Sequence, residues 1–368
     1  MHRAQTQYRS QRRCACAVNP TPPFSWARPF YVREALLCLP AMPLLLLTGI
    51  VTGHEAAGVV AAGGAFSVAF GASRDLRGRR WGAMLAACAG VTLAAFCGTL
   101  VGASPWLFLA SCALGAGFCA ALGLVDDNLW WVALQVVLAL MVAGYFAPAP
   151  GALTGNGAPV TPAMAAATYR AAATLVGGVA QIGCVMLLAT LFPSARGPLP
   201  VGPPKPPADT GALWAQAARA AIAVTLAALI AHAAGLSNSY WAPMTALLVV
   251  KPGLHDTRSR GVSRMVGTLV GGIVATLYVL AWHDQKVALI CALALAAGSA
   301  FALQKADYGA MTAAITATVV MLTSLVAGHV LANAEHRLLN TLLGGLVALL
   351  AAWVLPHRDR NAAVPEIP

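Results

Sequence analysis

The sequence predicts an all-α, polytopic membrane protein with about 12 transmembrane helices in two pseudo-equivalent six-helix halves. Only 10% of the 368 residues are charged and 59% are hydrophobic, whereas about 25% are charged in a typical soluble domain. Apolar runs long enough to cross a bilayer follow one another along the chain. Lys and Arg gather in the short segments between these runs. This composition excludes an ordinary soluble enzyme and a disordered chain.

The first half is predicted over residues 34–193, after a disordered cytoplasmic tail at residues 1–33. The tail contains six arginines and no acidic residue. Pro40 and Pro43 should kink the first apolar run, because proline cannot donate the helical hydrogen bond. The apolar runs of this half are residues 36–53, 56–72, 82–102, 105–125, 129–147 and 171–192.

The second half is predicted over residues 213–357, and residues 358–368 form a cytoplasmic tail. A Pro-rich linker at residues 194–212 joins the halves and should be an extended cytoplasmic connector. The run at residues 239–250 is short for a full crossing, so it is extended by its flanks, broken or re-entrant. The apolar runs of this half are residues 213–235, 239–250, 262–282, 287–304, 308–331 and 338–356.

The distribution of positive charge predicts the orientation. If the amino terminus lies inside and the spans alternate, the inside segments hold 20 of the 23 Lys and Arg residues. The other three are Arg170, Lys286 and Arg337. Positive residues concentrate on the cytoplasmic side of membrane proteins, so we expect both termini to be cytoplasmic. Topology also accounts for the net charge of +11, and we expect no nucleic-acid partner.

A repeat relates the two halves. With a shift of 181 residues, a D-x-R-x-R pattern in a loop aligns with a second copy, and Asp126 aligns with Asp307. The two copies are Asp75, Arg77 and Arg79 in the first half and Asp256, Arg258 and Arg260 in the second. The repeat predicts two halves with the same orientation, related by an axis along the membrane normal.

A second pattern, R-x-x-x-T-x-x-G-G, begins at Arg170, Arg264 and Arg337, each time at the opening of an apolar run. Its named positions lie on one face of a helix. The glycines then permit close packing between helices, with the arginine as a positive anchor. Alternatively, the arginine contacts an anion where such helices leave a gap. Arg170 and Arg337 open their runs from the outer side, which makes them candidates for an outer gate.

The segment from Tyr240 to Gly253, together with the motif at Arg264, resembles the FUSC family of fusaric acid resistance protein-like, or aromatic acid exporter, membrane proteins. The matching residues are Tyr240, Trp241, Thr245, Pro252, Thr257, Arg264, Gly267, Thr268 and Gly271. The resemblance implies a bacterial inner-membrane protein that exports small organic anions, typically aromatic carboxylic acids. The chain is also similar to plant aluminium-activated malate transporters, which are anion channels, and this similarity implies a path between the two halves.

Cationic side chains are the candidates for an anion path, because the planar guanidinium group of arginine can pair with a carboxylate through two hydrogen bonds. Arg264 is the first candidate, since the motif and the family pattern both contain it. The predicted path residues are Arg264, Thr268, Arg258, Arg260, Lys251, Arg77, Arg79 and Trp241. Alternatively, the cations only set the topology among lipid headgroups, and Trp241 belongs to the interfacial aromatic belt.

Proton coupling needs a titratable group near the path, and the candidates are Asp126, Asp307 and His232. A carboxylate beside a membrane cavity can carry a proton, and ionisable groups inside a membrane are frequently functional. Alternatively, the two aspartates cap helices or lie in solvated turns, and His232 bonds to a neighbouring helix.

The sequence therefore predicts an inner-membrane efflux transporter of small organic anions, coupled to protons. The alternatives are a passive anion channel and a non-transporting scaffold of an envelope pathway. The chain has no Walker A, H-E-x-x-H or G-x-S-x-G motif, so we expect no enzyme activity, cofactor or metal. The expected partners are the anionic substrate, the lipid bilayer, and a second copy of the chain or a periplasmic adaptor.

Overall fold

The computed structural model describes residues 32–76, 78–79, 81–148, 163–195, 205, 207–282, 284–304, 306–325 and 330–355, without the side chains of residues 330–334. In these residues the regular structure is helical, apart from one isolated bridge between Leu76 and Arg79. The all-α fold class is therefore confirmed. Arg77, the tail predicted at residues 358–368, and most of the predicted amino-terminal tail and linker lie outside the described residues.

Helices follow all six apolar runs of the first half. α2 (Val32–Cys38) and α3 (Ala41–Val51) form one apolar span that is broken at Pro40, which confirms the predicted kink. The other helices are α4 (Glu55–Ala69), the 3-10 helix η1 (Phe70–Ser73), α5 (Gly82–Val101), α6 (Pro105–Leu122), α7 (Asp127–Tyr145), α8 (Ala163–Leu191) and the 3-10 helix η2 (Pro193–Ala195).

Helices also follow the six runs of the second half, but two of them are short. These helices are α9 (Thr210–Ala233), α10 (Trp241–Val249), α11 (Leu254–Trp282), α12 (Lys286–Leu303), α13 (Tyr308–Ser324) and α14 (Val330–Val354). Within the described residues, ten helical stretches are long and apolar enough to cross a membrane. α13 has 17 residues, and α10 has nine, which span only about 13 Å. The chain is a polytopic membrane protein in which the run at residues 239–250 forms only a short helix.

Three helices begin earlier than their apolar runs. α8, α11 and α14 start at residues 163, 254 and 330, so Arg170, Arg264 and Arg337 lie about two to three turns inside their helices instead of opening them. Hydropathy marks where a helix enters apolar surroundings, whereas backbone hydrogen bonding continues beyond that point. The position of each arginine inside its helix is therefore a correction to the sequence-based interpretation.

The two D-x-R-x-R copies also differ in structure. Asp256 and Arg258 lie in the first turns of α11, which corrects the prediction of a loop. The first copy does lie in a loop, where Gly78 has a positive φ of 73° and the bridge between Leu76 and Arg79 closes a tight turn. Glycine adopts this left-handed conformation without the steric cost that a side chain adds.

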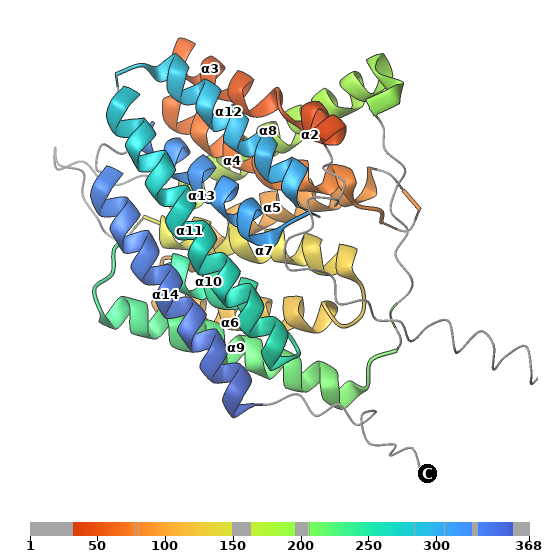
Figure 1. The fold of residues 1–368 in the computed structure, drawn as a ribbon, viewed down its shortest axis with the longest axis vertical. Helices are drawn as coiled ribbons and strands as arrows, with labels where there is room; N and C mark the ends of the chain where they lie inside the picture. Colours follow the sequence, from red (N-terminus) through yellow and green to blue (C-terminus); the bar gives the residue numbers. More distant parts are fainter. Residues whose placement is uncertain are drawn as a thin grey trace, which may run out of the picture. The chain divides into compact units, whose positions relative to one another are not determined.

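The same helix pairs pack in both halves. α5 packs on α7 and α8 in the first half, and α11 packs on α13 and α14 in the second; α4 packs on α8 as α10 packs on α14. Figure 1 shows α11 and α14 side by side. Across the halves, α6 packs on α9, and α12 packs on α2. The fourth helix of each half therefore contacts the first helix of the other.

Glycines of the R-x-x-x-T-x-x-G-G motif lie where helices meet most closely. A Cβ at Gly177 would overlap the carbonyl group of Ala61, and a Cβ at Gly344 would overlap that of Ala242. A Cβ at Gly271 would likewise overlap the carbonyl group of Ala313. The glycines therefore bring α8 onto α4, α14 onto α10 and α11 onto α13, which fixes the height of each motif arginine against its neighbouring helix.

Candidate functional site

Two arginines of the motif lie buried in the second half and reach the same short helix. Arg264 on α11 and Arg337 on α14 are each 6% exposed. Arg264 Nε donates a hydrogen bond to Thr245 Oγ1 at 3.5 Å, and the Cζ of Arg337 lies 3.8 Å from the ring centroid of Trp241. Trp241 and Thr245 are one turn apart on α10. The two guanidinium groups are therefore neighbours along α10, and their charges act on each other.

Neither arginine has a negative partner in the part of the chain that the structure describes. The ion pairs there are Lys205–Asp127 and Lys286–Glu55. Arg337 Nη2 donates to Thr316 Oγ1 at 3.4 Å, but its Nε is buried without an acceptor among the described residues. On insertion scales, one arginine at the centre of a membrane helix costs about 2.5–3.5 kcal/mol. Two buried guanidinium groups whose charges act on each other, and which have no negative partner among the described residues, favour the binding of an anion.

Small and hydroxylated residues shape the surroundings of this pair. Thr268 lies one turn after Arg264 on α11 and is 3% exposed. Gly267 and Gly271, on either side of it, pack against the backbone of α13. This close approach brings Thr316 of α13 to Arg337, so hydroxyl groups from α10 and α13 face the two guanidinium groups.

Arg170, the other predicted outer-gate residue, has a different role in the structure. Arg170 Nη1 donates to the carbonyl oxygen of Ala143 at 3.0 Å, and Nη2 donates to that of Phe146. These carbonyl groups belong to the carboxyl-terminal end of α7, where backbone oxygens lack helical partners and the helix dipole favours a cation. Arg170 is therefore a capping residue, whereas Arg337 stacks on Trp241.

Trp241 lies inside the protein instead of in an interfacial belt. It is 9% exposed, and its ring centroid lies 5.0 Å from that of Tyr240. Tyr240 in turn contacts Tyr145 of α7, with ring centroids 4.8 Å apart. The aromatic cluster thus joins the first half to the amino-terminal end of α10, directly beside Arg337.

The first half repeats the packing but not the pair of buried arginines. The residues 181 positions before Arg264, Thr268 and Thr245 are Ala83, Ala87 and Gly64, and all three are buried. Arg170, which occupies the motif position of Arg337, donates to backbone carbonyl groups instead. Among the described residues, the arginine pair therefore occurs in the second half.

Cations from both halves converge at the predicted cytoplasmic end, each over an aromatic ring. Lys251 Nζ lies 4.0 Å from the ring centroid of Trp130, Arg260 Cζ 4.6 Å from that of Tyr308, and Arg74 Cζ 5.9 Å from that of Trp131. Cation–π contact is favourable at such distances. Burial lowers the pKa of Arg74. Among the other predicted path residues, Arg79 and Arg258 are exposed.

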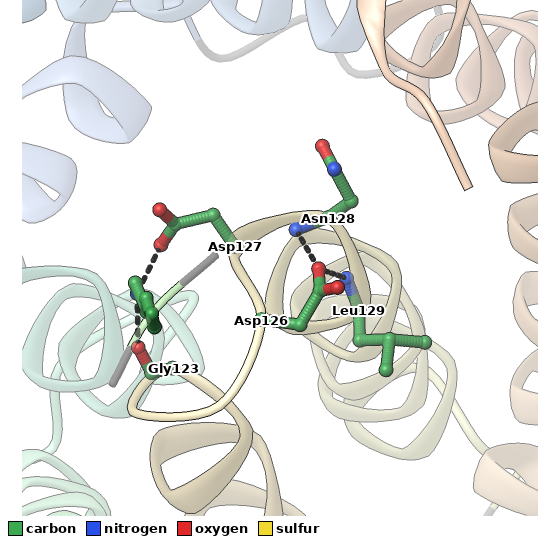
Figure 2. A network of polar contacts seen from close by, with 6 residues as sticks. Gly123, Asp126, Asp127, Asn128 and Leu129 are labelled. Atoms are coloured by element: carbon green, nitrogen blue, oxygen red, sulfur yellow. Dashed lines mark hydrogen bonds and ion pairs between the residues drawn. The ribbon is translucent and has the colours of Figure 1, made fainter. Parts of the chain in front are cut away.

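The predicted proton-coupling residues lie at helix ends. Asp126 Oδ1 accepts hydrogen bonds from the backbone N–H groups of Asn128 and Leu129, at 2.6 and 3.0 Å, and so caps α7 (Figure 2). Asp307 caps α13 in the same way, accepting from Ala310 N at 2.7 Å. Both aspartates thus occupy the N-cap position, which is one of the two alternatives weighed from the sequence. His232 is exposed, in the last turn of α9.

Three residues that shape these sites are not among the predicted path or coupling residues: Arg219, Thr316 and Trp130. Arg219 is 1% exposed and donates to Gln216 Oε1 and to Pro252 O, both at 2.9 Å. It thereby ties α9 to the turn that carries Lys251. Gln216 and Arg219 are three residues apart in an apolar run, a polar pair on one helix face that is a recognisable signal. Thr316 and Trp130 gave no signal, because hydroxyl and aromatic residues are common in apolar runs.

Comparison with known proteins supports the resemblance stated above. Residues 226–351 match the family model described as fusaric acid resistance protein-like. The matched residues lie within the second half. The chain is similar to two proteins of Escherichia coli K12: the uncharacterized protein YhfK, 34% identical over 146 residues, and the inner membrane protein YccS, 31% identical over 143 residues.

The similarity covers only part of each protein. Both E. coli alignments cover 38% of this chain, but only 20% of YhfK and 19% of YccS. An uncharacterized protein of Neisseria gonorrhoeae, ORF2, is 28% identical over 159 residues, which are 41% of this chain and 38% of that protein. No solved structure matches. The matched family segment contains Arg264, Arg337 and the residues of α10 that they contact.

Proposed function

We propose that the protein transports small organic anions across the inner membrane, and that Arg264 and Arg337 contact the anion. The observation that carries this proposal is the pair of adjacent, buried guanidinium groups with no negative partner among the described residues. An anion between them offsets the cost of burying two like charges. The hydroxyl groups of Thr245 and Thr316 supply further donors for a carboxylate.

Aromatic carboxylates are the proposed substrate class, and export to the periplasm is the proposed direction. The description of the matching family model supports this choice, since fusaric acid is an aromatic carboxylic acid. The cluster of buried rings beside Arg337 also offers apolar surface next to the charge. The proposal also includes coupling to protons and a cytoplasmic location of both termini. The proposed partner is a second copy of the chain or a periplasmic adaptor.

Helix movement is part of the proposed mechanism. Neither of two small cavities among the described residues, one beside Lys286 and one beside Lys251, is lined by Arg264 or Arg337. Both guanidinium groups are buried, so we expect an anion to reach them when neighbouring helices separate. The close glycine contacts hold α11 on α13 and α14 on α10, so we expect each of these pairs to move as a unit.

The first prediction concerns Arg264. We expect Arg264→Ala to lower the rate of benzoate transport into liposomes by about tenfold to a hundredfold. A charge-assisted hydrogen bond contributes about 1.5–3 kcal/mol, and 1.4 kcal/mol corresponds to a factor of ten. Arg33→Ala is the matched control, because Arg33 is an exposed arginine outside the predicted path. The measurement is uptake of radiolabelled benzoate by purified protein, with insertion checked by protease accessibility.

The outcomes separate the alternatives. Normal transport by correctly inserted Arg264→Ala contradicts the role given to the pair, and a wild-type protein without flux supports a non-transporting scaffold. Accumulation of benzoate against its gradient, lost when the proton gradient is collapsed, supports a proton-coupled transporter. Flux that only equalises the concentrations supports a passive channel.

A further inference from the structure

A cationic cavity lies away from the arginine pair, where residues of the two halves meet. It has a volume of about 20 Å³ and is lined by Trp130 from the first half and by Gln216, Lys251 and Pro252 from the second, among others. A cavity holds a water molecule once its volume exceeds about 10–15 Å³. The space therefore admits one water-sized group, such as one oxygen atom of a carboxylate.

The ammonium group of Lys251 has unused donors beside this cavity. Nζ lies over the ring of Trp130 and forms no hydrogen bond or ion pair with a described residue. An ammonium group carries three N–H donors, and the ring of Trp130 lies on only one side of this group. The neighbouring carboxylate of Asp127 is bound by Lys205, whose Nζ lies 2.6 Å from Asp127 Oδ1 and 2.6 Å from Gly123 O. No acceptor among the described residues remains for Lys251, so its other donors are available to water or to a ligand.

The backbone holds Lys251 in place from two sides. Arg219 Nη1 donates to the carbonyl oxygens of Lys251 and Pro252, at 3.4 and 2.9 Å. Thr257 Oγ1 accepts from Lys251 N at 3.0 Å and donates to Lys251 O at 3.1 Å. Arg219 is 1% exposed, and its Nε is buried without an acceptor among the described residues. Defined hydrogen bonds therefore hold this turn, and a second, buried cation, Arg219, contacts its backbone.

We propose that the cavity lined by Trp130, Gln216 and Lys251 binds the carboxylate group of a small organic acid. The ring of Trp130 offers a flat apolar surface beside the charge. The choice of ligand class rests on the proposed function, but binding at this site does not require transport. In the transport cycle this is the site that loads the anion before it reaches Arg264 and Arg337.

Binding at this cavity depends on pH. Burial, followed by the charge of Arg260, lowers the pKa of Lys251 to about 7. Lys205 also lowers this pKa, whereas Asp127 and Cys119 raise it. The remaining charged group in contact is Arg219, through the backbone of Lys251. Lysine is charged below its pKa, so the site attracts anions at acidic and neutral pH and loses this attraction as the pH rises through 7.

The test measures benzoate binding to the purified full-length protein by isothermal titration calorimetry at pH 6 and pH 8. Benzoate stays ionised throughout, so the wild type should bind about tenfold more weakly at pH 8, where about a tenth of Lys251 is charged. Lys251→Met should remove this pH-dependent binding. Lys251→Arg keeps its charge at both pH values and should bind at both. Lys286→Met, which changes an exposed lysine, should behave as the wild type.

Three results overturn the proposal: a wild type that does not bind benzoate at pH 6, a Lys251→Met variant with unchanged pH-dependent binding, or a well-folded Lys251→Arg variant that does not bind. Folding is checked by size-exclusion chromatography and circular dichroism. Arg264→Ala should retain the pH-dependent binding at Lys251. This variant therefore separates the two proposals, because transport can fail at Arg264 while the Lys251 cavity still binds its ligand.

Discussion

At the scale of single residues, one motif position serves two purposes. Arg170 and Arg337 occupy the same place in R-x-x-x-T-x-x-G-G. Arg170 donates to carbonyl groups at the end of α7, so backbone oxygens satisfy its guanidinium group. Arg337 lies on Trp241 and retains a buried Nε without an acceptor among the described residues. The chemistry of a motif arginine therefore depends on where the neighbouring helix ends.

This difference predicts opposite effects of substitution. Arg170→Ala should destabilise the protein by about 1.5–3 kcal/mol, the usual contribution of a hydrogen bond to a charged group, with little effect on transport by the folded fraction. Arg337→Leu should leave stability unchanged or raise it, because it removes an uncompensated charge, and should impair transport. Thermal unfolding in detergent and benzoate flux in liposomes measure the two effects. A large loss of stability in Arg337→Leu would show that this guanidinium group has a structural partner.

At the scale of helices, small residues decide which elements approach each other. Gly271 and Gly272 are adjacent on α11, but only Gly271 meets the backbone of α13. The nearest atom to a Cβ at Gly272 is Thr316 Cγ2, at 4.0 Å, which is an ordinary contact distance. One glycine of the pair is thus required for packing, and the other is not.

Two alanine substitutions test this distinction. Gly271→Ala should destabilise the protein by about 1–3 kcal/mol, the usual cost of overpacking, because α11 and α13 must move apart. Gly272→Ala should be neutral or stabilising by up to about 1 kcal/mol, since alanine is the better helix former. The midpoint of thermal unfolding measures both. Equal effects of the two substitutions would contradict the packing described for α11 and α13.

The sequence predicted the helices better than their ends or contacts. Apolar runs located every helix, because length and hydropathy follow from the bilayer itself. The same signal could not show that α11 begins at Leu254, since Asp256 and Arg258 extend the helix with polar residues. The motif predicted that Arg264 and Arg337 were important, but the contact of both with α10 is a tertiary property. Lys251 was predicted for the path, whereas its ring partner Trp130 lies more than a hundred residues away.

At the scale of the whole molecule, the orientation is predicted from the distribution of charge. The predicted cytoplasmic segments hold 20 of the 23 Lys and Arg residues, and such an excess retains loops on the cytoplasmic side. A reporter fused after residue 203 should therefore be cytoplasmic, and one fused after residue 155 periplasmic. Alkaline phosphatase and green fluorescent protein fusions measure this, because the first is active only in the periplasm and the second fluoresces only in the cytoplasm. The reverse pattern would invert the proposed direction of transport.

The two halves repeat the same helix pairs, but the pair of Arg264 and Arg337 lies in the second half. Ala83, Ala87 and Gly64 hold in one half the places that Arg264, Thr268 and Thr245 hold in the other. The first half thus repeats the packing with small residues in place of Arg264, Thr268 and Thr245. Its own motif arginine, Arg170, is held by backbone carbonyl groups. Arg264 is therefore not required to build such a bundle, and under the proposed function each molecule contains one anion path.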